Sequence, residues 1–369
     1  MRSTLLLLSL SAFIQGQTLI KQTFDTETEG WMAMGGTASV KVTHDASAIK
    51  SGAGALAYTY SLDGEGFGAA ILPVGARKVA EMRGVRFWVK SDHDTAVGVL
   101  LSEKKPGGNY TAIFWAPKDV WQRVDLNLAD FAANDGPTDP VDPDGKLDTD
   151  QVEGVGLIDL SALFNHVPAE APMVVTHSTG SHTLYIDDFE IPSTPAAEAP
   201  KPMTVDRFDR SFSSWFTLGG ISISVLSSTD NPIGGPALLA SIQAADGKIA
   251  ILTRRVNGPS IAGAKRIAFD VAADHEGTFI LSIEVEKKGS ATGQGPRYNF
   301  MFYPPDGRKV FRVNVSLTDF DHDDNSPEDP ASKLEAGRIK TISIGDITAM
   351  AGGASGPNKI WIGPVEMVR

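Results

Sequence analysis

Apolar and polar residues alternate in short runs along most of this chain. The segment 110–131 shows the pattern clearly, because a Pro-Lys-Asp turn signal divides it into two apolar runs. In the second run, every other residue from Val124 to Leu128 is apolar and the residues between them are polar. Successive side chains of a strand point to opposite faces. The segment therefore predicts two antiparallel strands, each with one buried face.

Similar runs fill the first half of the chain, whereas helical signals are brief. Gly, Pro, Asn and Asp separate the runs at spacings typical of an all-β sandwich. The predicted strands of this half are 39–43, 55–60, 68–72, 84–90, 96–102, 111–115, 123–128, 155–159 and 183–191.

The same short sequence segments recur in the second half of the chain. The residues Phe, Asp, Trp and a Gly pair within 24–36 recur within 208–220 at one constant offset, and 298–320 repeats much of 110–131. The shared segments occur in the same order in both copies. A repeat this long indicates tandem domains rather than a solenoid.

A Pro/Ala-rich segment, 193–202, lies between the two copies and has no apolar face. Such a composition favours an extended, semi-rigid linker. We therefore predict one β-sandwich at 17–192 and a second, diverged β-sandwich at 203–369.

Residues 1–16 have the composition of a signal peptide. Arg2 is followed by an apolar stretch from Leu5 to Ile14, which is too short to span a bilayer as a stable helix. We therefore expect a secreted or periplasmic protein with a cleaved signal peptide and no membrane insertion.

Charge and cysteine content narrow the possible partners. The formal net charge is −12 and no basic patch is visible, so a nucleic-acid partner is not expected. The chain has no Cys, which excludes disulfides, thiolate metal sites and cysteine nucleophiles.

Five short segments in the first copy give it a resemblance to the galactose-binding-like jelly-roll domains. The resemblance is closest to family-11 carbohydrate-binding modules and to complex I intermediate-associated protein 30 domains. It covers nearly all of residues 20–192 and, more weakly, 203–369. The segments are FDTETEGW from Phe24, the Ser-Gly-x-Gly-Ala-Leu segment from Ser51, GVRFWVKSD from Gly84, the W-x-x-V-x-L-x-L-x-x-F signature from Trp121, and LYIDDFEI from Leu184.

The resemblance implies a non-catalytic module that binds a polysaccharide or glycan on a concave sheet face. It also implies a structural Ca²⁺ in the first domain, held by Asp25, the backbone near Lys50 and Ser51, and Asp187. In the second copy Gly363 stands where Asp187 would be, so a calcium site is not expected there.

Aromatic rings that stack on sugars are the candidate ligand-binding residues: Trp115, Tyr110, Trp88, Tyr298 and Tyr303. Tyr110 and Trp115 are five residues apart, so on a regular strand they point to opposite faces and one of them is expected in the core.

Other tryptophans, among them Trp121, are interpreted as core or edge packing. Trp88 falls on the same side of its strand as Arg86 and Lys90, away from Phe87 and Val89.

Two other functions stay open. A structural or protein-interaction role is the main alternative, with a protein partner in place of a glycan. An enzyme is the weaker alternative, because the sequence has no zinc-binding His spacing, no Gly-x-Ser-x-Gly motif and no singled-out pair of carboxylates.

Overall fold

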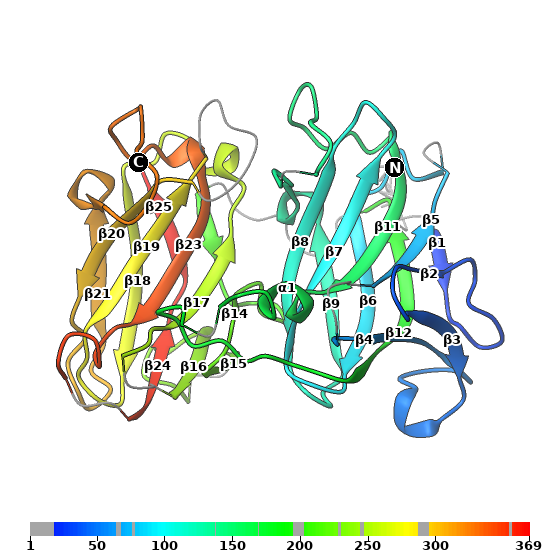
Figure 1. The fold of residues 1–369 in the computed structure, drawn as a ribbon, viewed down its shortest axis with the longest axis horizontal. Helices are drawn as coiled ribbons and strands as arrows, with labels where there is room; N and C mark the ends of the chain where they lie inside the picture. Colours follow the sequence, from blue (N-terminus) through cyan, green and yellow to red (C-terminus); the bar gives the residue numbers. More distant parts are fainter. Residues whose placement is uncertain are drawn as a thin grey trace, which may run out of the picture.

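The structure is a computed structural model that describes residues 18–63, 68–75, 78–136, 138–168, 170–194, 203–227, 230–243, 247–286, 295–353 and 356–369. The predicted signal peptide and most of the predicted linker lie outside these residues. The chain folds into two β-sandwiches that stand side by side (Figure 1).

The first sandwich consists of two antiparallel sheets. Sheet A has the strand order β3-β4-β12-β6-β9, with β1 beside β12, and sheet B has the order β10-β8-β7-β11-β5-β2. The strands are β1 (Thr18–Gln22), β2 (Met32–Met34), β3 (Ser39–Thr43), β4 (Ala55–Ser61), β5 (Ala69–Pro73), β6 (Gly84–Ser91), β7 (Thr95–Glu103), β8 (Asn109–Ala116), β9 (Gln122–Asn127), β10 (Ala132–Ala133), β11 (Val152–Asp159) and β12 (Ser181–Pro192).

The second sandwich repeats this arrangement. Sheet C has the order β13-β25-β18-β24-β16-β15, with β21 beside β18, and sheet D has the order β14-β17-β23-β19-β20-β22. The strands are β13 (Thr204–Asp206), β14 (Phe216–Thr217), β15 (Ile221–Leu226), β16 (Ala237–Gln243), β17 (Ala250–Arg255), β18 (Arg266–Ala273), β19 (Phe279–Val285), β20 (Arg297–Phe302), β21 (Phe311–Ser316), β22 (Asp321–His322), β23 (Ile339–Asp346), β24 (Pro357–Ile362) and β25 (Val365–Val368).

Within the described residues, the helical elements are short pieces in the connections. None of the helices within the described residues is long and apolar enough to cross a membrane. The pieces are α1 (Ser161–Phe164) and the 3₁₀ turns η1 (Ala46–Ala48), η3 (Leu128–Asp130), η4 (Gly258–Ile261), η5 (Leu317–Asp319) and η6 (Ala336–Arg338).

The predicted fold class, two tandem all-β sandwiches, is confirmed. One strand pairing was wrong. The strands predicted within 110–131 do not pair with each other, because β8 lies in sheet B beside β7 and β10 whereas β9 lies in sheet A beside β6. The Pro-Lys-Asp turn therefore carries the chain from one sheet to the other. Alternation reveals which face of a strand is buried, but it does not identify the neighbouring strand.

The two faces of β8 serve different domains. Tyr110, Ala112 and Phe114 point into the first sandwich and belong to its buried cluster. Trp115 points outward and belongs to the buried cluster of the second sandwich. The opposite orientation of Tyr110 and Trp115 follows the predicted alternation.

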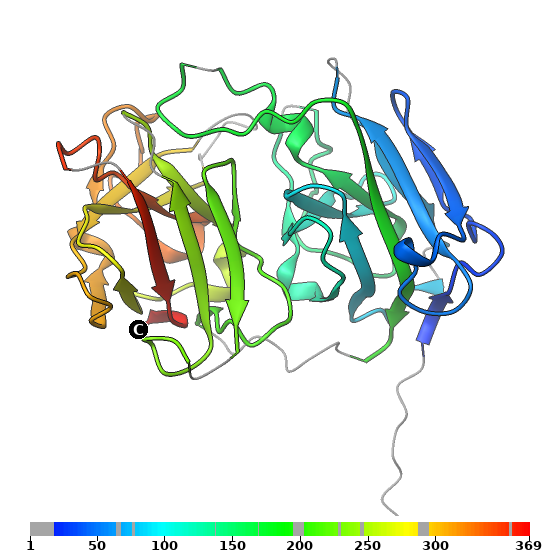
Figure 2. The same cartoon turned by 90° about the horizontal axis from the view of Figure 1, so that it is seen from below.

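The sandwiches are joined by backbone and side-chain contacts. The Trp115 amide donates to the Ser213 carbonyl (2.8 Å), and the segment from Pro172 to Thr176 adds backbone bonds to Ile249 and Leu218. Figure 2 shows this segment crossing from the first sandwich to the second. An ion pair between Arg210 Nη1 and Asp130 Oδ2 (2.8 Å) closes the contact on the side of β9.

Gly84 offers a test of the β6–β9 pairing in sheet A. Its φ is +148°, and a Cβ there would lie 1.9 Å from the Leu126 carbonyl oxygen, a backbone atom that has no room to move. We expect Gly84→Ala to lower the free energy of unfolding by more than about 2 kcal/mol in urea denaturation. Gly235→Ala is the control, because a Cβ at Gly235 meets open space. Equal stability of the two variants would contradict this account of the sheet.

Candidate functional site

A groove of about 330 Å³ lies where the two sandwiches meet, and three tryptophans line it. We call it the tryptophan groove. Trp88 comes from β6, Trp115 from β8, and Trp121 from the turn that precedes β9. The second sandwich supplies the opposite wall through residues 211–213 and 223–225, the latter on β15.

Trp88 faces this groove because of the strand period. Phe87 and Val89 are buried in the core of the first sandwich, whereas Trp88 is half-buried on the outer face of sheet A. The neighbouring outward residues are Arg86 and Lys90, as the alternation predicts. The outer face of β6 therefore carries one aromatic ring between two cations.

Lysines lie over the aromatic rings of this face. Lys50 Nζ is 4.2 Å from the ring centroid of Trp88. Lys90 Nζ lies 5.8 Å from the ring of Trp121 and 5.4 Å from that of Tyr185 on β12. Such contacts contribute about 0.5–1 kcal/mol each at exposed sites. They help to hold the rings in place.

The walls of the groove are fixed by hydrogen bonds across its base. Gln122 Nε2 donates to the Trp115 carbonyl at 2.6 Å, and Ser211 Oγ donates to the Arg123 carbonyl at 2.6 Å. Arg123, which lines the groove, is positioned by Asp125, whose carboxylate lies 3.2 Å from Arg123 Nε. The same carboxylate accepts a hydrogen bond from Arg86 Nε at 2.5 Å. The groove thus combines flat rings with guanidinium, amide and hydroxyl groups, which suits a ligand with apolar faces and hydroxyl edges.

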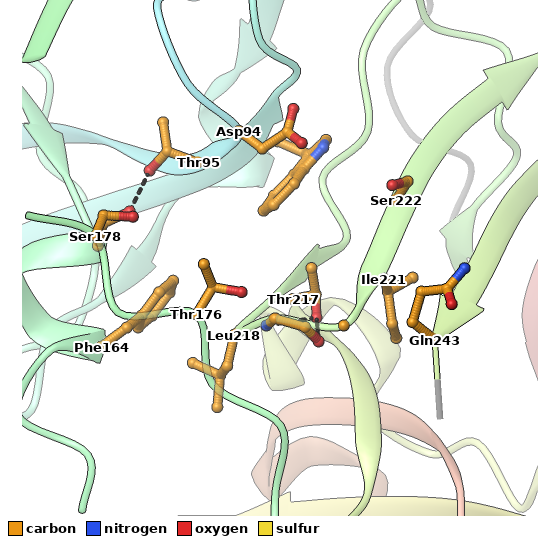
Figure 3. Close-up of a pocket in the computed structure, with 14 residues that line it drawn as sticks. Asp94, Thr95, Phe164, Thr176, Ser178, Thr217, Leu218, Ile221, Ser222 and Gln243 are labelled. Atoms are coloured by element: carbon orange, nitrogen blue, oxygen red, sulfur yellow. Dashed lines mark hydrogen bonds between the residues drawn. The ribbon is translucent and has the colours of Figure 1, made fainter. Parts of the chain in front are cut away.

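Trp115 also contributes to the packing between the two sandwiches. It is only 6% exposed and packs in the buried cluster of the second sandwich. It also lines a second cavity between the domains, of about 250 Å³, whose walls carry the hydroxyls of Thr95, Thr176 and Thr217 (Figure 3).

Two predicted ligand-binding tyrosines are core residues instead. Tyr110 and Tyr298 are buried in their own sandwiches, and their hydroxyls donate to Asp142 and to Asp329 Oδ2 (2.7 Å). Burial, followed by the contact with the aspartate, raises the pKa of each phenol. Direct stacking of a ligand on either ring does not fit these positions. Both face inward because they share the parity of the core residues of their strands.

Tyr303 is 57% exposed and belongs to a different place. It lines a cavity of about 850 Å³ on the second sandwich, together with His275, Pro304 and Asn358. The structure therefore brings Trp88 and Trp115 together but leaves Tyr303 apart from them.

The two aspartates predicted for calcium both contact the segment 50–53. Asp187 Oδ2 accepts the backbone N–H groups of Lys50 and Ser51 at 2.9 Å each, and Asp25 Oδ1 accepts that of Ala53 at 2.6 Å. Burial raises the pKa of Asp187 despite these bonds, whereas the Ala53 bond lowers the pKa of Asp25. N–H donors, which a cation repels, thus occupy these carboxylate oxygens. Calcium binding stays a prediction from the resemblance.

Sequence reasoning missed several residues of this site. Trp121 was interpreted as packing, yet it is half-buried and lines the groove. Tyr185 and Arg123 were not singled out, and Lys90 was placed beside Trp88 but not named as a site residue. The position of Tyr185 and Arg123 on this face follows only from the pairing of β12 with β6 and of β6 with β9, which places Tyr185 opposite Lys90 and Trp88 opposite Arg123.

Comparison with known proteins found structural likeness only. No protein-family model and no curated protein sequence matches the chain. A family-11 carbohydrate-binding module from Clostridium thermocellum, solved with a mixed-linked β-1,3-1,4 tetrasaccharide, is 13% identical with a TM-score of 0.36 and covers 45% of this chain and 94% of its own.

A tandem of two family-22 carbohydrate-binding modules from Paenibacillus barcinonensis Xyn10C is 14% identical with a TM-score of 0.30 and covers 96% of this chain and 98% of its own. A family-30 carbohydrate-binding module is 13% identical with a TM-score of 0.31 and covers 42% and 91%. These values are too low to transfer a ligand or a binding site to this chain.

The buried position of Trp115 leads to a prediction about stability. We expect Trp115→Ala to lower the free energy of unfolding by about 3–5 kcal/mol, because it leaves a cavity between the domains. Tyr303→Ala, at an exposed position, should change it by less than about 0.5 kcal/mol. Urea denaturation followed by circular dichroism measures both. A Trp115→Ala variant as stable as Tyr303→Ala would show that the inter-domain core does not form.

Proposed function

We propose that the protein is a non-catalytic, extracytoplasmic binding protein that recognises a polysaccharide or glycan in the tryptophan groove. The observation that carries this proposal is the convergence of Trp88, Trp115 and Trp121 on one groove with a polar rim. Sugar rings offer apolar C–H faces to aromatic rings and hydroxyls to charged and amide groups. Export, the remaining part of the proposal, rests on the composition of residues 1–16.

The groove spans both sandwiches, which is a further reason for tandem domains. Neither sandwich alone contains it, because Trp88 and Trp121 belong to the first and residues 211–213 and 223–225 to the second. The proposal therefore assigns the second sandwich a wall of the binding site, although no calcium site is expected in that copy.

Affinity electrophoresis tests the proposal. The mature protein is run through gels that contain β-glucan, xylan, mannan or pectin. We expect one polymer to retard it and Trp121→Ala and Trp88→Ala each to weaken the retardation by about 30-fold in Kd, the effect of a residue central to a binding site. Tyr303→Ala serves as the matched control and should migrate as the wild type does.

Trp115→Ala is unsuitable as a binding test because it removes part of the inter-domain core. Retardation that persists in both Trp88→Ala and Trp121→Ala would place the ligand elsewhere. Retardation by no polymer, with a cooperative melting transition, would count against glycan binding as such.

The predicted calcium site has a separate test. If Ca²⁺ holds Asp25 and Asp187 together, EGTA should lower the melting temperature of the wild type by several degrees and leave Asp187→Asn unchanged, since a bound ligand stabilises only the folded state that binds it. Equal melting of the wild type with EGTA and with added Ca²⁺ would instead favour the N–H-bonded arrangement.

A protein-interaction role is the second candidate, and one surface favours it. Met32 and Met34 on β2 are 53% and 60% exposed, and the half-buried Ile71 lies opposite Met32 in β5. Methionine-rich apolar surfaces are common at protein interfaces. If no polymer retards the protein, this surface is where a protein partner should be sought.

A further inference from the structure

Two histidines and an aspartate form a cluster where β6 ends and β12 begins. The pairing of these strands puts Leu184 opposite Ser91, and continuing it puts His182 opposite His93. Asp92 is held by the same register, because its Oδ2 accepts the Thr183 amide at 2.8 Å. The ligand-type atoms of Asp92, His93 and His182 all lie within 4.8 Å of one another.

Both imidazole rings turn the same nitrogen towards one carboxylate oxygen. His93 Nδ1 and His182 Nδ1 each lie 2.9 Å from Asp92 Oδ1. The far nitrogens also face oxygens: His182 Nε2 is 3.0 Å from the Thr179 carbonyl, and His93 Nε2 is 3.0 Å from Asp159 Oδ2. Every nitrogen of the two rings therefore faces an atom that accepts hydrogen bonds.

Two neutral imidazole rings cannot donate a hydrogen bond to each of these four acceptor contacts. A neutral imidazole has one N–H and one bare nitrogen. Hydrogen bonds alone would satisfy all four contacts only if both rings carried a positive charge, with their centroids 3.9 Å apart. A divalent cation at the two Nδ1 atoms and Asp92 removes the conflict. The bare Nδ1 atoms would bind the cation, His182 Nε2–H would donate to the Thr179 carbonyl, and His93 Nε2–H would lie 3.0 Å from the Asp159 carboxylate.

The outward contacts have the form of a metal site's supporting shell. A metal-bound histidine usually donates its other N–H to a carboxylate or a backbone carbonyl, which fixes the ring. Asp159 is itself buried and held, since Thr95 Oγ1 (2.5 Å) and the Ser161 amide (2.7 Å) donate to its Oδ1.

We propose that Asp92, His93 and His182 bind a divalent transition-metal ion of the Zn²⁺ class. Two imidazole nitrogens and one carboxylate oxygen suit Zn²⁺, Co²⁺ or Ni²⁺ rather than Ca²⁺, which prefers oxygen ligands. Asp92 and His182 are partly exposed, so water can complete the coordination. This site is distinct from the predicted calcium residues and does not depend on the proposed function.

The second sandwich provides an internal control. Asp274 and His275 repeat Asp92 and His93, but the register of β18 and β24 puts Asn358 where the first copy has His182. Asn358 Oδ1 accepts the His275 amide at 3.1 Å, and Asp274 pairs with Arg308 at 2.6 Å. The second copy thus lacks one imidazole, and its aspartate forms an ion pair with an arginine.

Isothermal titration calorimetry with Zn²⁺ tests the proposal on the whole protein, made without a polyhistidine tag and treated with chelator. We expect one Zn²⁺ per chain in the wild type and in His275→Asn. His182→Asn, which gives the first copy the residue of the second, should weaken binding by at least about tenfold. Circular dichroism shows whether the variants are folded.

Three results would overturn the proposal. The first is a wild type that takes up no Zn²⁺, Co²⁺ or Ni²⁺. The second is a folded His182→Asn that binds Zn²⁺ as the wild type does, and the third is loss of the site in His275→Asn. Ca²⁺ should not compete with Zn²⁺ at equal concentration, and competition would show that the site uses oxygen ligands.

Discussion

The two sandwiches exchange aromatic side chains, and the geometry between them depends on this exchange. The side chain of Trp115 projects from β8 of the first sandwich and packs in the buried cluster of the second. In return Phe212, from the segment between β13 and β14, packs in the cluster of the first, with its ring 6.2 Å from that of Phe114. Burial of such rings is worth several kcal/mol. The backbone bond from Trp115 to Ser213 fixes the register between the two insertions.

The tryptophan groove is a consequence of this contact. Trp88 and Trp121 stand on the outer surface of the first sandwich, where they would form only a flat patch. The segment around Phe212 and the edge of β15 close that patch into a groove. Lys50 lies over the ring of Trp88 and Lys90 over that of Trp121. Tandem duplication thus has a structural consequence here, because a surface of one copy becomes a groove when the other copy packs against it.

Much of the fold could be predicted from the sequence. The strands predicted in the first half correspond to β3–β9, β11 and β12 within a few residues, because each has a clear alternation and polar punctuation. The strands β1, β2 and β10 were missed, since they are short or lie at sheet edges where burial is incomplete.

The site was less predictable because it depends on pairing between distant strands. Alternation put Trp88 on an outer face and separated Tyr110 from Trp115, but it could not tell which face stays open. Whether an outward ring contacts solvent or a second domain is decided by inter-domain packing, which leaves no periodic signal. His93 and His182 meet for a similar reason, since the register of β6 and β12 joins residues far apart in the chain.

The indole N–H resonances of the chain's six tryptophans test the central claim most directly. In a ¹⁵N-labelled sample titrated with oligosaccharides of β-glucan, xylan, mannan and pectin, one series should shift the signals of Trp88 and Trp121. The signals of the buried Trp31, Trp215 and Trp361 should stay in place. Saturable binding that leaves Trp88 and Trp121 unshifted would contradict the assignment of the groove as the binding site.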